Sequence, residues 1–80
     1  MQRYRIEVLQ YATNDKLFAN CNSISFTNGG AANCTINNYS LTPGATLSIS
    51  GNAGEIDVTE YKISFPANAG LLTVIRKTYV

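Results

Sequence analysis

The sequence predicts an all-β fold: a small antiparallel β-sandwich or partly open barrel of about six or seven strands. Two observations predict it. Apolar and polar residues alternate with period 2 in several short runs, as in strands with one buried face. Turns rich in Gly, Pro and Asn separate these runs, and helical periodicity is absent. Because the chain has only 80 residues, we expect a single domain over residues 1–80.

The first strand is expected over Arg3 to Tyr11 (RYRIEVLQY). Tyr4, Ile6 and Val8 alternate with charged residues, so we expect them to share the buried face. The second strand opens near Leu17 to Ala19 and is clearer over Ile24 to Phe26.

Asn28-Gly29-Gly30 predicts a β-hairpin after this strand. A three-residue loop would pair Phe26 with Ala32 and Ile24 with Cys34, on the same face as Ile36. Cys34 then faces the core and Cys21 has the opposite parity, which predicts two free thiols, as a reducing compartment of synthesis would favour. A two-residue loop, or a bulge before Ile24, would change these faces.

The central stretch from Ile36 to Phe65 predicts a turn, a strand, a tight hairpin and a longer strand. The turns are Leu41 to Gly44 and Gly51 to Gly54. Apolar parity shifts after Val58, which predicts a β-bulge near Thr59-Glu60. A turn at Pro66 to Gly70 then leads to a last strand, Leu71 to Val80. That strand is apolar on both faces, so it should be central or covered on its second side.

The residue types disfavour catalysis, and we expect no enzyme, cofactor or metal. The chain has no histidine, and its two cysteines lack CxxC spacing. The one carboxylate cluster could serve a calcium site or a carboxylate pair, but a solvated face beside a turn is the favoured interpretation. Its members are Glu55, Asp57 and Glu60.

Charge disfavours nucleic-acid and membrane partners. Six basic and five acidic residues give a net charge of +1. The N-terminus has no apolar run typical of a signal peptide, and no run approaches the roughly 18 residues of a membrane span. A small barrel binding single-stranded nucleic acid remains an alternative that would need four basic residues to cluster: Arg3, Arg5, Arg76 and Lys77.

Tyrosines and two arginines supply the candidate interface. Tyr4 and Tyr61 are in phase with apolar neighbours and are expected in the core. The interface candidates are Tyr11, Tyr39, Tyr79, Arg3 and Arg5. Exposed tyrosines beside Asn and Asp in a shallow groove would instead suit a carbohydrate-binding or adhesion module.

Composition favours assembly. Only 14% of residues are charged, against about 25% in a typical domain. So small a core gains stability from partner subunits, and we expect a homo-oligomer. An ordinary secreted or viral β domain could show the same composition.

The run NG–IN–N–Y–L–PG–L–I–GN–GEID–T–Y–I–F resembles small β-sandwich structural proteins of bacteriophage virions, particularly short decoration-type proteins. The resemblance implies a non-enzymatic capsid or tail decoration or cement component that self-associates and binds other virion structural proteins. It also implies location in the virion after synthesis in the host cytoplasm without a signal peptide. The matching positions are Asn28, Gly29, Ile36, Asn37, Leu41, Pro43, Gly44, Leu47, Ile49, Gly51, Asn52, Gly54 to Asp57, Thr59, Tyr61, Ile63 and Phe65.

Overall fold

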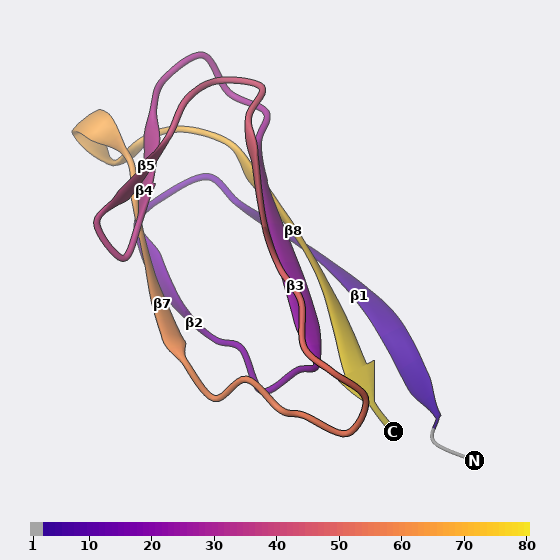
Figure 1. Cartoon of the computed structure of the whole chain (residues 1–80). Coiled ribbons are helices and arrows are strands. Elements are labelled where there is room, and N and C mark those ends of the chain that lie inside the picture. The colour runs from indigo at the N-terminus through magenta and orange to yellow at the C-terminus, as the bar shows by residue number, and fades with distance from the viewer. Residues whose placement is uncertain (1–2) are drawn as a thin grey trace.

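The computed structural model describes residues 3–80 as two antiparallel four-stranded sheets that face each other (Figure 1). This confirms the predicted all-β sandwich, with eight strands rather than six or seven. The first sheet has the order β1-β8-β3-β6 and the second β2-β7-β4-β5. The strands are β1 (Tyr4–Tyr11), β2 (Asp15–Phe18), β3 (Ser23–Asn28), β4 (Cys34–Ile36), β5 (Tyr39–Leu41), β6 (Thr46–Ile49), β7 (Glu60–Ser64) and β8 (Leu72–Tyr79). A single 3₁₀ turn, Pro66–Asn68, lies in the predicted turn before β8.

Both predicted hairpins are wrong, because at each the chain crosses from one sheet to the other. Phe26 pairs with Leu47 of β6 and Val74 of β8, not with Ala32. Likewise β6 lies in the first sheet and β7 in the second. Alternation shows which side chains share a face, and an apolar face meets the core whether two arms pair edge to edge or face each other across it. The alternating pattern therefore does not distinguish a hairpin, in which two successive strands pair, from an arch, in which they lie in opposite sheets.

Two buried asparagines, one at each end of β3, donate hydrogen bonds to the segments that cross between the sheets. The Asn28 amide, which is fully buried, donates to the Ala32 and Leu41 carbonyls at 2.8 and 2.9 Å. The Asn22 amide donates to the Asn52 and Glu55 carbonyls at 2.7 and 3.0 Å. Backbone carbonyls that leave the sheets thus keep hydrogen-bond partners.

The last strand of the central stretch is shorter than predicted. It begins at Glu60, and Ile56 and Val58 are 45% and 77% exposed. Only Asp57 makes an isolated bridge, to Cys21. The parity shift near Thr59 therefore marks the start of a strand and not a bulge within one.

The core lies between the sheets. Tyr61 is buried there as predicted, with its ring 5.1 Å from that of Phe26. Both cysteines are free, as predicted, and both are fully buried. The predicted placement of Cys21 on the opposite face was wrong, because Cys21 precedes β3 at a bend and does not continue its alternation.

The predicted face of the first strand is reversed. Tyr4, Ile6 and Val8 are 55%, 56% and 62% exposed, and Leu9 and Tyr11 pack against the core instead. Leu9 pairs with the fully buried Val74 of β8, which fixes the inward parity of β1. The prediction for the last strand is confirmed, because β8 lies between β1 and β3.

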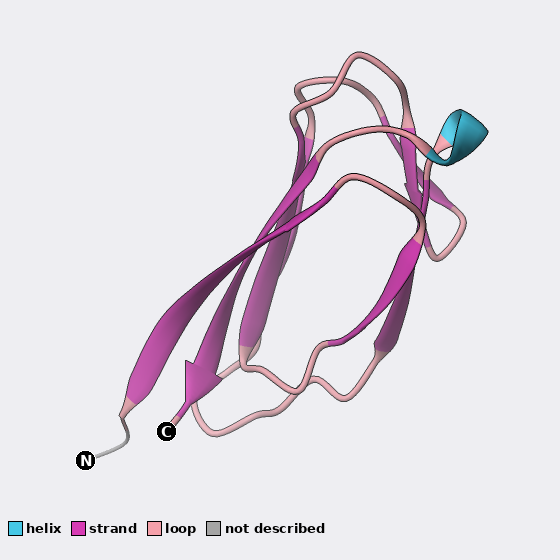
Figure 2. Cartoon of the chain, turned by 180° about the vertical axis from the view of Figure 1, so that it is seen from behind, coloured by secondary structure: helices cyan, strands magenta, loops and turns pink. Residues whose placement is uncertain are grey.

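The paired strands β1 and β8 form a two-stranded ribbon. Its end at Tyr4 and Tyr79, the extended end, projects beyond the second sheet. These strands have eight residues each, whereas those of the second sheet have three to five. The molecule is accordingly elongated, 44 × 18 × 16 Å. Figure 2 shows the start of β1 and the C-terminus beside each other at the extended end of the ribbon.

Candidate docking face

The side of the first sheet that faces away from the core carries a row of exposed apolar residues. We call this row, Tyr4, Ile6, Val8 and Ile75, the outer stripe. Val8 pairs directly with Ile75, while Ile6 and Tyr4 pair with Lys77 and Tyr79 of β8. Ile75 is 42% exposed even though β8 is a central strand. The stripe is therefore continuous over two neighbouring strands.

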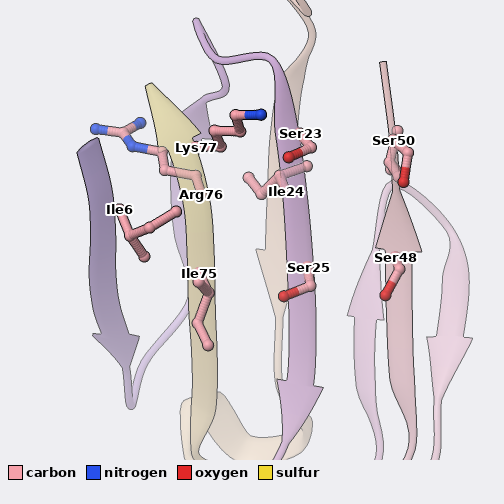
Figure 3. A pocket seen from close by; sticks show the side chains of 10 residues that line it. Ile6, Ser23, Ile24, Ser25, Ser48, Ser50, Ile75, Arg76 and Lys77 are labelled. Carbon is pink, nitrogen blue, oxygen red and sulfur yellow. The ribbon is translucent and has the colours of Figure 1, made fainter. Parts of the chain in front are cut away.

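Small hydroxyl residues adjoin the outer stripe. Ser25 pairs with Ile75 on one side and Ser48 on the other, and Thr27 lies opposite Thr46 with their hydroxyls 3.0 Å apart. Figure 3 shows Ile6, Ile75, Ser25 and Ser48 in this order across the sheet, so that Ser25 lies between Ile75 and Ser48. Their short side chains leave a shallow hollow of about 230 Å³. The face thus combines an apolar ridge with a low, hydroxyl-lined surface.

Aromatic residues border the outer stripe at its extended end. The Lys77 ammonium lies 4.4 Å from the centroid of the Tyr4 ring, a cation–π contact. The Tyr79 hydroxyl accepts a hydrogen bond from the Gly54 N–H at 2.8 Å, which brings the loop between β6 and β7 to this end. Lys77 and the Gly54 loop therefore limit the stripe without covering it.

The opposite face of the same ribbon is polar where the second sheet ends. Arg76 Nε donates to Glu7 Oε1 at 2.7 Å, and the Thr78 hydroxyl donates to the same oxygen at 3.1 Å. Arg76 also donates to the carbonyls of Phe18 and Ala19, at 3.0 and 3.3 Å. Hydrogen bonds from Arg76 and Thr78 hold the pKa of the Glu7 carboxyl below its usual value. This network joins the ribbon to the chain that follows β2.

The structure distributes the predicted interface residues over three places. Arg3, Arg5 and Tyr79 lie at the extended end of the ribbon, where Tyr79 is on the face of the outer stripe and Arg5 is on the opposite face with Glu7. Tyr11 faces the core side and is half-buried, and burial, together with the nearby Asp15 charge, raises the pKa of its phenol. Tyr39 is 55% exposed on β5 of the second sheet. These residues therefore do not form one surface.

Sequence reasoning missed Ile6, Val8 and Ile75 as surface residues. A signal was present, because β1 carries apolar residues on both parities, with Tyr4, Ile6 and Val8 on one and Leu9 and Tyr11 on the other. β8 does the same. Two neighbouring strands with two apolar faces leave one face without a partner in the chain.

The clustered carboxylates serve the loop between β6 and β7. Asp57 accepts hydrogen bonds from the Thr59 N–H at 2.8 Å and from the Tyr61 hydroxyl at 2.6 Å. Burial and this bond to Asp57 raise the pKa of Tyr61 to about 12. Glu55 Oε1 accepts from the Asn52 N–H at 2.6 Å. No group of three potential metal-ligating side chains occurs among residues 3–80.

The basic residues at the chain ends do not gather on one open face. Arg76 is bound to Glu7 and to carbonyls on the core side, whereas Lys77 lies on the outer side against Tyr4. Arg5 Nε is 3.8 Å from Glu7 Oε2, which offsets its charge. This arrangement lacks the continuous basic groove that single-stranded nucleic acid requires.

Within residues 3–80, no helix has the length and apolarity needed to cross a membrane. The outer stripe is the most continuous exposed apolar surface described above. The sequence matches no protein-family model, and comparison with curated proteins and with solved structures finds no match.

Proposed function

We propose that this chain is a non-enzymatic structural assembly module, which self-associates and docks on a larger protein shell through the outer stripe. One observation carries the proposal: four large apolar side chains, each at least 42% exposed, lie next to one another on a regular sheet face. Scattered apolar residues are common on surfaces, whereas contiguous ones mark interaction sites.

The make-up of this face suits a protein partner. Burying apolar surface contributes about 25 cal/mol per Å². Tyr4 and Tyr79 provide aromatic area of the kind that is enriched at interfaces. The neighbouring serines and threonines leave room for a partner's side chains and offer hydrogen bonds at the rim. The Lys77 ammonium lies beside the outer stripe, against the Tyr4 ring.

The larger shell is proposed from the resemblance to decoration-type proteins of bacteriophage virions. In that setting the chain is a capsid or tail decoration or cement component, located in the virion, and its partners are copies of itself and other virion structural proteins. Its acidic side chains support a non-enzymatic role, because Glu55 and Asp57 hold their own loop and Glu7 holds Arg76.

Light scattering over a hundredfold concentration range tests self-association. We expect a closed oligomer for the native chain. The double variant Val8→Thr/Ile75→Thr keeps two β-branched side chains but removes apolar surface from the stripe. It should weaken association about tenfold or more, because the variant replaces a methyl group of Val8 and the ethyl group of Ile75 by hydroxyls, at a cost of about 0.8 kcal/mol for each buried carbon removed.

Phe18→Ser is the matched control, because Phe18 is 65% exposed but lies in β2 of the second sheet. It should associate like the native chain. A native chain that stays monomeric at every concentration would overturn the proposal, as would a double variant that associates normally. In those cases glycan-array binding, with Tyr39→Ala as its control, would test the carbohydrate-binding alternative.

A further inference from the structure

One edge of the first sheet offers a second copy of this chain a complementary strand. Among residues 3–80, no strand pairs with the side of β1 that faces away from β8. This open edge runs the full eight residues of β1. Long open edges with apolar side chains are templates for pairing with another chain.

The hydrogen bonding of β1 shows which residues face that edge. The Val80 N–H donates to the Arg3 carbonyl at 3.1 Å, and Arg3 is followed by the register Tyr4↔Tyr79 and Arg5↔Thr78. Backbone groups alternate in direction along an antiparallel strand, so odd-numbered residues bond to β8. Tyr4, Ile6 and Val8 therefore direct their N–H and C=O groups away from the sheet.

We propose that two copies pair β1 with β1 in antiparallel fashion, about a two-fold axis that passes through Ile6. This inference rests on the self-association proposed above and adds the open edge of β1 to the outer stripe as a contact. In this register Ile6 faces Ile6 of the second copy, and Tyr4 faces its Val8. The outward N–H and C=O groups of all three residues then find backbone partners, and the outer stripes of the two copies become one surface.

Charge selects this register over its neighbours. With the axis at Ile6, Arg5 of each copy lies opposite Glu7 of the other. An axis at Arg5 or at Glu7 would place like charges directly opposite, which is destabilising. An axis at Tyr4 would set Arg3 against Arg5, and one at Val8 would set Arg5 and Glu7 against uncharged residues.

Glu7 and Arg5 are placed to make these contacts. Glu7 Oε1 is occupied by Arg76 and Thr78, whereas Oε2 has Arg5 Nε at 3.8 Å. The Arg5 side chain is 64% exposed. Arg5 of a second copy can therefore donate to Oε2 without displacing the Arg76 network. Charge-assisted bonds of this type are shorter and stronger than neutral ones.

Oxidative crosslinking tests the register. In the Ile6→Cys variant, residue 6 of one copy lies opposite residue 6 of the other copy. The two Cα atoms are then about 5.5 Å apart, within the range of a disulfide. We expect diamide to give a covalent dimer that dithiothreitol reverses. Val8→Cys is the control, because residue 8 faces Tyr4, and it should crosslink at least tenfold more slowly. Mixing Val8→Cys with Tyr4→Cys should restore the crosslink. Native Cys21 and Cys34 are fully buried and do not compete.

Arg5→Glu tests the charge contact without a new thiol. It places Glu opposite Glu7 at both ends of the pairing, and we expect association to weaken roughly tenfold at low salt and less at high salt. Light scattering of the native chain separates the possible failures. If the native chain is an oligomer but Ile6→Cys and Val8→Cys crosslink equally, or Arg5→Glu associates normally, the β1 pairing is wrong and self-association stands. A monomeric native chain overturns both.

Discussion

The two sheets carry very different outer faces. The second sheet places Lys16 directly opposite Lys62 and Thr35 opposite Ser64, so its outer face is largely polar, with Phe18 as an isolated exposed apolar side chain. The first sheet instead places Val8 opposite Ile75 on its outer face. Both sheets nevertheless use their inner faces in the same way, to close one core.

This difference shows which surface needs a partner. The strands of the second sheet mostly alternate, and their outer lysines oppose the approach of a neighbouring sheet. β1 and β8 are apolar on both faces, but the second sheet covers only one of them. Residues 3–80 contribute no further layer over the outer stripe, and we propose that another molecule covers it.

The largest expected effect is the difference in the free energy of unfolding between shortening a core side chain and shortening an outer-stripe side chain. Phe26 is fully buried and packs on Tyr61 of the opposite sheet, so we expect Phe26→Ala to lower the free energy of unfolding by about 3–5 kcal/mol. Ile75→Ala should cost the monomer only about 0.5 kcal/mol. Urea unfolding at a concentration where the chain is monomeric measures both. Equal costs would mean that the outer stripe is already covered within one chain.

Alkaline pH should weaken the second sheet at β7. Because the pKa of Tyr61 is raised to about 12, its contribution to stability is complete below pH 10 and is lost as the pH rises through about 12. Tyr61→Phe should remove this alkaline loss, and should cost about 1 kcal/mol at neutral pH through the hydrogen bond to Asp57. Ultraviolet titration should show one late phenol that the variant lacks. Unchanged late ionisation in Tyr61→Phe would contradict the assignment.

Acid should produce a smaller effect, in the first sheet. Hydrogen bonds from Arg76 and Thr78 lower the pKa of Glu7, so its contribution is present above the usual carboxyl value of 4.5 and is lost as the pH falls through the lowered pKa. Glu7→Gln should flatten the acid limb of stability against pH. Thermal unfolding of the two chains between pH 2 and 6 measures this, with Glu60→Gln as the control. Parallel acid limbs would exclude Glu7 as a source of the pH dependence.

Part of the fold around the candidate face could be predicted from the sequence. The apolar character of β8 on both faces correctly predicted a central strand. Tyr79 lies on the face of the outer stripe, whereas Arg5 lies on the opposite face with Glu7. The sequence places the β1 part of the outer stripe in the core, which is wrong. Alternation shows that Tyr4, Ile6 and Val8 share a face. It does not show whether this face meets the core or the solvent, because Leu9 and Tyr11 make the other face apolar as well.

The sequence by itself determined the all-β class and the turns at Pro43-Gly44 and Pro66 to Gly70. These properties depend on local backbone preference and on the period-2 alternation of apolar residues. The thiols are free as predicted, but not for the predicted reason, because Cys21 is buried like Cys34. Only the tertiary structure decided which strands pair, that β3 and β6 lead into arches, and which face of β1 meets water. Those outcomes depend on contacts far apart in the chain, such as Leu9 with Val74 and Asn28 with the Leu41 carbonyl, for which a period-2 pattern contains no information.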